Sequence, residues 1–440
     1  MTPPDRRRFI ATSLSLLLPS SLLAACREPQ AQAQAARALP TAELRTLPTA
    51  AAVMPATLPT LEAKPYQPTP LPPPTPTTQP AGPDGQAFPM KTSRLEFGAA
   101  AHLFYTDRYT PLLKARDAGF SWVRQQIHWK DQEGPAGNYV WGELESIIYD
   151  TDAQGLKLLI SIVQAPDFYT LNGGNGLPAN PDHLGNFVAA LVERYKGKIG
   201  AIEIWNEQNL AYENGGHVAV KDAGHYVELL KTAYTRIKAI DPGVYVIAGP
   251  PASTAVNAPG VAVDDLSYYE GMFGYQNGII RNYMDAQAVH PGGSANPPDT
   301  LWPDSPSKAD GWTTDRTFYF RRVEDVRALM VNYGMSNTPI WITEFGWATQ
   351  NDTPGFEFGN QVSFDQQAEY IVGAMRRTAE QYPWVGAMFL WNLNFGPIKA
   401  QQGLALNEQA SFSILDGGYN PRPAYWAIHK YIGELRAAGK

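Results

Sequence analysis

Two glutamates, each at the end of a short apolar run, are the residues of this chain best suited to acid–base and nucleophilic chemistry. Glu207 ends the segment AIEIWNE, and Glu344 lies in the segment PIWITEFGW. Runs rich in Ile and Trp that give way to polar or glycine-containing sequence are typical of buried strands and the loops that follow them. If both strands belong to one barrel, the two carboxyl groups lie at the same mouth.

A pair of facing carboxyl groups can break a glycosidic bond. One group protonates the departing oxygen, while the other attacks the anomeric carbon or activates a water molecule. At separations of about 5 to 5.5 Å the attack is direct and configuration is retained, whereas about 6.5 to 9.5 Å admits a water and gives inversion. The residue types alone leave both outcomes open.

Eight apolar runs alternate with amphipathic stretches, which predicts a (β/α)8 TIM barrel, an α/β fold. The predicted strands begin at Leu95, Ser121, Leu156, Ala201, Val244, Met284, Pro339 and Val385. The predicted helices span residues 111–118, 141–154, 181–196, 221–240, 264–280, 317–333, 363–382 and 423–435. A doubly wound open sheet is the alternative, but no glycine-rich phosphate-binding turn follows the first strand.

Alternation along the fourth predicted strand places Glu203, Trp205 and Glu207 on one side. The two isoleucines between them suit the layer between strands and helices, so the first set is expected inside the barrel. Glu203 lies lower in the barrel than Glu207, which favours a structural carboxylate paired with a cation. Arg124 on the second predicted strand is a candidate partner.

Residues 1–26 have the pattern of a bacterial export signal. Three arginines at positions 6–8 precede an apolar stretch of about 15 residues, too short to span a bilayer. The RRRFI string resembles a twin-arginine signal, and LAAC at 23–26 resembles a lipobox. Cys26 is the only cysteine, so we expect it to carry a lipid rather than form a disulfide. A chance cysteine at an ordinary cleavage site is the alternative.

Residues 27–90 consist mostly of Ala, Pro, Thr and Gln, as in LPPPTPTTQP at 71–80. So few large apolar side chains cannot offset the entropy of ordering, and this composition predicts a disordered tether. The expected organisation is therefore a signal, a tether and a barrel domain over residues 91–440. We expect the protein to be exported and held by lipid on the outer face of the cell membrane or cell surface.

Composition and motifs also exclude several functions. The formal net charge of -7 argues against nucleic acid as a partner. The 11 Trp and 22 Tyr provide flat rings on which sugars can stack, although core packing accounts for most of them. The seven histidines form neither an HxH pair on the first strand nor an HExxH helix, so we expect no metal or other cofactor. No GxSxG elbow indicates an esterase.

The strings WNEQN and TEFGW, on the fourth and seventh predicted strands, resemble the retaining glycoside hydrolases of clan A, families 39 and 5 above all. The segment HWKDQEGPAGNYVW agrees with this resemblance, which extends from about Leu95 to Leu435. The resemblance implies hydrolysis of a β-linked oligo- or polysaccharide with retention. It implies that Glu207 is the acid/base and Glu344 the nucleophile.

The same resemblance implies roles for four binding residues. Asn206 corresponds to the residue that binds the sugar 2-hydroxyl, and Arg124 to the arginine that supports the nucleophile. His290 corresponds to the sixth-strand histidine, and Trp391 to the platform under the cleaved sugar. The clan usually has a tyrosine two residues after this histidine.

Gly292 stands at that tyrosine position in this chain. Tyr319 or another loop tyrosine is a candidate replacement. The missing tyrosine leaves open a barrel that binds glycan without cleaving it, serving as a surface lectin or sensor. Transglycosylation is a third possible outcome of the same chemistry.

Overall fold

The computed structural model describes residues 95–170 and 174–439 of the chain. These residues form a closed barrel of eight parallel strands in the order β1 to β8, with β8 pairing back onto β1. The strands are β1 Glu96–Ala100, β2 Trp122–His128, β3 Lys157–Val163, β4 Ala201–Ile204, β5 Tyr245–Ala248, β6 Ala286–Val289, β7 Ile340–Phe345 and β8 Val385–Leu390. The predicted (β/α)8 barrel is confirmed. The predicted signal, Cys26 and the whole of the predicted tether lie outside the described residues.

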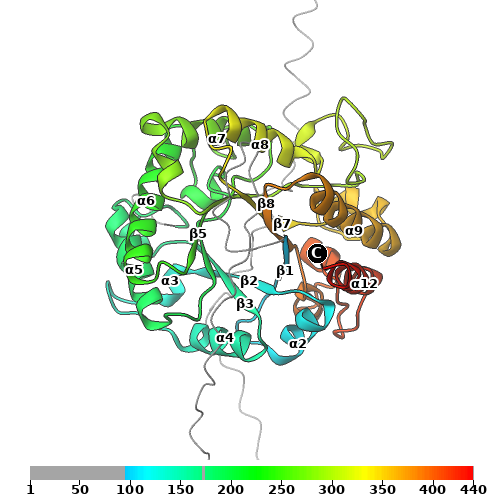
Figure 1. Cartoon of the computed structure of the whole chain (residues 1–440), viewed down its shortest axis with the longest axis horizontal. Coiled ribbons are helices and arrows are strands. Elements are labelled where there is room, and N and C mark those ends of the chain that lie inside the picture. The colour runs from blue at the N-terminus through cyan, green and yellow to red at the C-terminus, as the bar shows by residue number, and fades with distance from the viewer. Residues whose placement is uncertain (1–94, 171–173, 440) are drawn as a thin grey trace, which may run out of the picture. The chain divides into compact units, whose positions relative to one another are not determined.

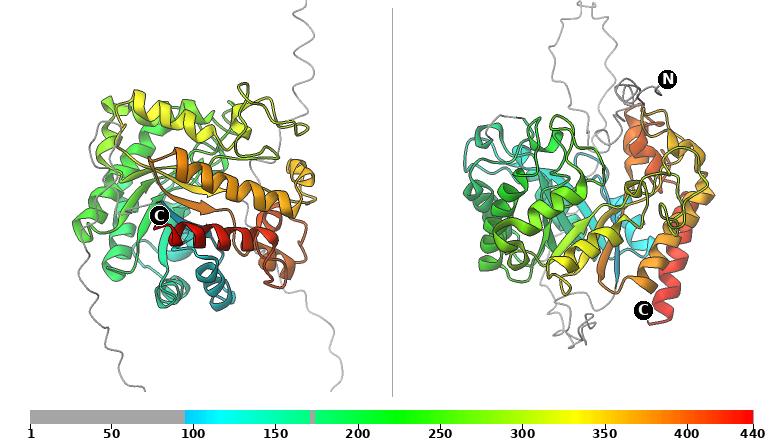
Figure 2. Two further views of the ribbon diagram at one scale, coloured as in Figure 1. Left: turned by 45° about the vertical axis from the view of Figure 1, so that its right-hand side comes forward. Right: turned by 90° about the horizontal axis from the view of Figure 1, so that it is seen from above.

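Helices surround the barrel, as Figure 1 shows, and α12 lies beside α9 in Figure 2. The α-helices are α2 Tyr109–Ala118, α3 Trp129–Gln132, α4 Gly142–Ala153, α5 Pro181–Arg194, α6 Asp222–Ile240, α7 Asp265–Gly274, α8 Arg322–Asn332, α9 Phe364–Gln381, α10 Phe395–Gln401, α11 Glu408–Phe412 and α12 Pro423–Ala437. The 3-10 turns are η2 Asp167–Tyr169, η3 Tyr212–Asn214, η4 Tyr275–Asn277, η5 Ile279–Asn282, η6 Arg316–Phe318 and η7 Glu357–Gln361. None of the described helices combines the length and apolar character needed to cross a membrane.

All eight predicted helices are present, with differences at their ends that have local causes. The segment predicted as a helix over 264–280 ends at Gly274, because Gln276 and Asn277 have positive φ values of 44° and 60°. In contrast, α5 begins as expected, since the Asn180 side chain accepts a hydrogen bond from the Asp182 amide.

Aromatic rings fill the barrel interior near the beginnings of the strands. Trp122, Tyr245 and Trp341 are almost fully buried there and pack with ring centroids 5.0 to 5.3 Å apart. Small residues on neighbouring strands, among them Ala201 and Ala286, leave the space that these rings occupy. The interior is therefore closed below the mouth.

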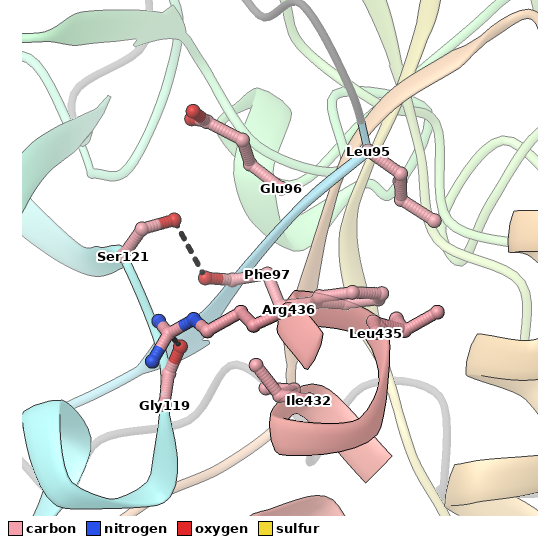
Figure 3. A pocket seen from close by; sticks show the side chains of 8 residues that line it. All are labelled: Leu95, Glu96, Phe97, Gly119, Ser121, Ile432, Leu435 and Arg436. Atoms are coloured by element: carbon pink, nitrogen blue, oxygen red, sulfur yellow. Dashed lines mark hydrogen bonds between the residues drawn. The ribbon is translucent and has the colours of Figure 1, made fainter. Parts of the chain in front are cut away.

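A small pocket opens where β1 begins, between Phe97, Ser121 and the last turns of α12 (Figure 3). Its wall is held by a hydrogen bond from the Arg436 guanidinium to the Gly119 carbonyl, 2.7 Å long. The pocket lies at the N-terminal ends of the strands, whereas active sites of such barrels lie at the C-terminal ends. The functional site is therefore expected at the opposite mouth of the barrel.

Candidate active site

Glu207 reaches the mouth through a turn that follows β4. The strand ends at Ile204, and both Trp205 and Glu207 have positive φ values, 68° and 50°. The Glu207 amide donates to the Pro250 carbonyl at 2.8 Å, which ties this turn to the end of β5. The regular alternation of side chains along β4 therefore ends at Ile204.

The expected interior position of Trp205 is wrong. It belongs to the large apolar cluster that also contains Ile202 and Ile204, not to the separate cluster inside the barrel, and its indole N–H donates to the Glu213 carbonyl. The left-handed backbone conformation at Trp205 redirects the side chain. Glu207 nevertheless lies at the mouth, because the second left-handed residue turns the chain again.

Glu344 lies on β7 at a β-bulge. Ile342 is opposite Met388 and Phe345 is opposite Leu390, so two residues of β7 face one residue of β8. A bulge of this kind redirects side chains and is common beside active sites. It allows the consecutive side chains of Thr343 and Glu344 both to reach the central cluster.

The two predicted catalytic carboxyl groups converge. One oxygen of Glu207, one oxygen of Glu344 and one ring nitrogen of His290 all lie within 4.8 Å of one another. The side chains of the two glutamates are only 9% and 13% exposed. Such an approach of two carboxyl oxygens matches the shorter of the two carboxyl separations, about 5 to 5.5 Å, better than the longer one of about 6.5 to 9.5 Å.

Arg124 connects the interior of the barrel to the mouth. Its guanidinium donates to Glu203 at 2.7 and 2.9 Å, to Glu344 at 2.6 Å and to the Asn206 side-chain oxygen at 2.8 Å. Burial alone would lower the pKa of Arg124, but the two carboxylates raise it above its ordinary value. The predicted pairing of Glu203 with Arg124 is confirmed.

His290, the residue after β6, lies between the two mouth carboxylates. Its Nδ1 is 3.1 Å from Oε1 of Glu207 and 3.8 Å from Oε2 of Glu344, and its Nε2 is 3.0 Å from the Thr343 hydroxyl. Burial lowers the pKa of His290, but the carboxylates outweigh burial and raise it. The ring therefore favours its protonated form more than an ordinary histidine does.

The pKa of Glu344 is also raised. Burial is the largest cause, and the negative charge of Glu207 adds to it, whereas His290 and Arg124 act in the opposite direction. The carboxyl group of Glu344 is thus mostly buried, and the positive charges of His290 and Arg124 stabilise its ionised form.

Asn206 and Trp391 are also placed at the mouth. Asn206 is fully buried, and its side chain is fixed by Arg124. Trp391 follows β8 with a partly buried ring, and its amide donates to the Phe345 carbonyl at 2.8 Å, one residue beyond Glu344. The structure therefore brings every predicted site residue of the barrel to one end.

Tyr319 does not replace the missing tyrosine. It is fully buried, and its hydroxyl donates to the Thr313 carbonyl at 2.5 Å and accepts from the Ser307 amide. That candidate role beside the nucleophile is wrong. Gly292 is exposed, and a Cβ atom added there would have Thr317 as its nearest neighbour, at 3.7 Å.

The donor atoms of Glu207, His290 and Glu344 are close enough to surround a cation. The guanidinium of Arg124 already lies 2.6 Å from Glu344, however, and its charge opposes a second cation at the same carboxylate. The cluster is therefore better matched to a neutral organic substrate than to a divalent ion.

Sequence reasoning missed Thr343 and Ser161, which bind His290 and Arg124 at 3.0 and 3.2 Å. It also missed Glu213, which is fully buried on η3 near Glu207. For Thr343, adjacency to Glu344 was the available signal, but strand alternation assigns adjacent residues to opposite faces. The bulge that overrides alternation leaves no mark in the residue types.

No protein-family model and no curated protein matches the sequence. Solved structures match instead. A family 39 glycoside hydrolase from the gut symbiont Bacteroides cellulosilyticus WH2 aligns with a TM-score of 0.57 and 18% identity, over 78% of this chain and 64% of that chain. The chain has the fold of the clan A glycoside hydrolases. The predicted resemblance to families 39 and 5 is thus confirmed for the fold.

Two further structures show the same likeness. A glucosidase from Croceicoccus marinus aligns with a TM-score of 0.55 and 13% identity, over 78% of this chain and 68% of that one. A GH5_18 protein from Streptomyces cattleya in complex with GlcNAc aligns with a TM-score of 0.54 and 13% identity, over 78% and 80%. The present chain spans less than two thirds of the family 39 protein.

Proposed function

We propose that this protein is a retaining glycosidase that hydrolyses the O-glycosidic bonds of a β-linked glycan by double displacement. The observation that carries the proposal is the approach of Glu207 and Glu344 to within 4.8 Å at one barrel mouth. The shared fold with glycoside hydrolases supports it.

In the first step Glu344 attacks the anomeric carbon while Glu207 protonates the departing oxygen, which leaves a glycosyl-enzyme ester and a neutral alcohol. In the second step Glu207, now a carboxylate, removes a proton from water as the water displaces Glu344. Arg124 and His290 favour the ionised form of Glu344 through their positive charges. Asn206 would bind the sugar 2-hydroxyl, and Trp391 would form the platform under the cleaved sugar.

The expected location fits an extracellular glycan as substrate. Export by the N-terminal signal and lipidation of Cys26 would place the barrel on the outer face of the cell, at the end of its tether. An oligo- or polysaccharide would then be cleaved outside the cell.

The alternative functions predict different products. A glycan-binding barrel, favoured by the exposed Gly292, would bind sugar without turnover. A transglycosylase would transfer the glycosyl group to an added sugar acceptor instead of water. Product analysis at high acceptor concentration separates transfer from hydrolysis.

The test uses the full chain. We expect turnover of an aryl glycoside found by screening a panel, and covalent labelling by the matching 2-deoxy-2-fluoro glycoside. Peptide mass analysis should place the label on Glu344, and Glu344→Ala should take up none while reducing turnover by about 10³-fold or more. Full activity of Glu344→Ala, or a label on another residue, contradicts the proposal.

A further inference from the structure

A buried hydroxyl supports the ring of His290 on the side away from the acid/base. Thr343 is fully buried in β7, and its Oγ1 lies 3.0 Å from Nε2 of His290. The other ring nitrogen, Nδ1, lies 3.1 Å from Oε1 of Glu207. The three side chains thus form a continuous hydrogen-bonded line that ends at Glu207.

We propose that Thr343 is a positioning residue for the acid/base: by binding Nε2 it holds Nδ1 of His290 against Glu207, so that these two groups share the proton delivered to the leaving oxygen. This inference rests on the proposed function, because it assigns the source of the proton that Glu207 transfers.

The geometry of the imidazole ring gives the first reason. When the Thr343 oxygen accepts a hydrogen bond from Nε2–H, Nδ1 faces Glu207 either as a lone pair or as a second N–H. A lone pair accepts the proton of a neutral Glu207, and an N–H donates to an ionised Glu207. One proton can therefore move between Oε1 and Nδ1 while the bond to Thr343 is kept.

The charges around the ring give the second reason. Glu207 follows β4, Glu344 lies on β7, and both carboxylates favour the protonated ring; Arg124 on β2 disfavours it, as does burial. The balance raises the pKa of His290, so the ring can hold a proton when Glu207 is ionised. Titration then belongs to the pair of groups, not to either residue alone.

Thr343 is suited to this task by its surroundings. Among the described residues, His290 is the hydrogen-bond partner of the Thr343 hydroxyl. Without that hydroxyl, Nε2–H would be buried with no acceptor in its place, which penalises the protonated pair. The proton should then leave the pair at lower pH.

Thr343→Val removes the hydroxyl at nearly constant volume. We expect the alkaline limb of kcat/KM to move to lower pH by about one unit, which corresponds to a hydrogen bond to a charged group. At neutral to mildly alkaline pH, kcat/KM should fall by up to about tenfold on a glycan with a poor leaving group. On an activated aryl glycoside it should change little. Thr343→Ser should restore the wild-type limb.

Thr378→Val is the matched control, because this buried threonine of α9 donates to the Ala374 carbonyl at 2.9 Å, on a helix outside the barrel. It should keep the wild-type limb. An unchanged limb in Thr343→Val, or an equal loss on both substrates, overturns the inference. If the proposed function itself is wrong, the result is different: the activity lost in Glu207→Ala would not depend on the leaving group.

A second measurement needs no substrate. NMR of full-length protein with isotope-labelled histidine follows the titration of His290, whose signal is assigned by its loss in His290→Asn. The midpoint of this titration should move to lower pH in Thr343→Val and return to the wild-type value in Thr343→Ser. A His290 titration that is the same in all three proteins overturns the inference.

Discussion

At the scale of single residues, the closeness of Glu207 and Glu344 has to be reconciled with their like charges. Two ionised carboxylates within 4.8 Å repel each other strongly in a buried site. The structure offsets this repulsion with the guanidinium of Arg124 on one side and the ring of His290 between the two groups. Both positive groups favour the ionised form of Glu344, which is the form that attacks in a double displacement.

The acidic limb of the pH profile reports the nucleophile. Attack requires ionised Glu344, and its pKa is raised above the ordinary value of 4.5 by burial first and by Glu207 second. Activity is therefore lost as the pH falls through this raised pKa. We expect the acidic limb of kcat/KM to lie above pH 4.5; a limb below that value would contradict the assignment.

Loss of the acid should depend on the leaving group. Glu207→Ala should reduce kcat/KM on an unactivated glycan by about 10²- to 10⁴-fold, because general acid catalysis contributes that much. An activated aryl glycoside departs with little protonation, so its loss should be much smaller. Comparing kcat/KM on the two substrates tests whether Glu207 is the general acid. Equal losses on both would show that it is not.

At the scale of elements, the position of Glu207 depends on a close approach between the ends of β4 and β5. The Tyr226 hydroxyl donates to the Ile204 carbonyl at 2.8 Å and accepts from the Gly249 amide at 2.6 Å. A Cβ added at Gly249 would lie 2.4 Å from that same carbonyl. Glycine therefore permits the two strand ends to meet beneath the Glu207 turn.

Gly249→Ala should displace that turn. Because the clash is with backbone, we expect the protein to be destabilised by about 1 to 3 kcal/mol. We also expect kcat/KM to fall by a larger factor than the affinity for substrate. The control is Gly433→Ala in α12, where an added Cβ has nothing within 4 Å. That change should stabilise by about 0.5 to 1 kcal/mol with unchanged activity. Urea unfolding and steady-state kinetics measure both variants, and equal effects would refute the packing argument.

The same elements show how far the sequence could be used for prediction. The eight strands were predictable because each apolar run is short and ends at polar or glycine-containing sequence, and the Arg124–Glu203 pair followed from alternation on β4. Alternation failed at Trp205, where the backbone turns left-handed, and at Thr343, where a bulge places neighbouring residues on one side. Both departures depend on tertiary contacts that no local pattern specifies.

At the scale of the whole molecule, a buried carboxyl group near the site lowers the free energy of unfolding at high pH. Glu213 is fully buried on η3, and in the described part of the chain neither of its carboxyl oxygens has a hydrogen-bond partner. Burial raises its pKa well above 4.5, and the charge of Glu207 raises it further. A raised folded-state pKa means that stability is complete below the unfolded pKa, about 4.3, and is lost as the pH rises toward the folded value.

Glu213→Gln removes this ionisable group while keeping its shape. The free energy of unfolding should match that of the wild type near pH 4 and exceed it at pH 8. Urea unfolding at the two pH values provides the comparison. A difference that is the same at both values would show that ionisation of Glu213 does not limit stability.

The proposed double displacement depends on direct attack by Glu344, and the anomeric configuration of the first product tests this most directly. Proton NMR of an early reaction mixture, before mutarotation, should show the β-anomer released from a β-glycoside by the full chain. Retention is predicted because one oxygen of each catalytic glutamate lies within 4.8 Å of the other, closer than the carboxyl separation of about 6.5 to 9.5 Å at which inverting enzymes place a water. Release of the α-anomer first would contradict the double displacement and the roles assigned to both glutamates.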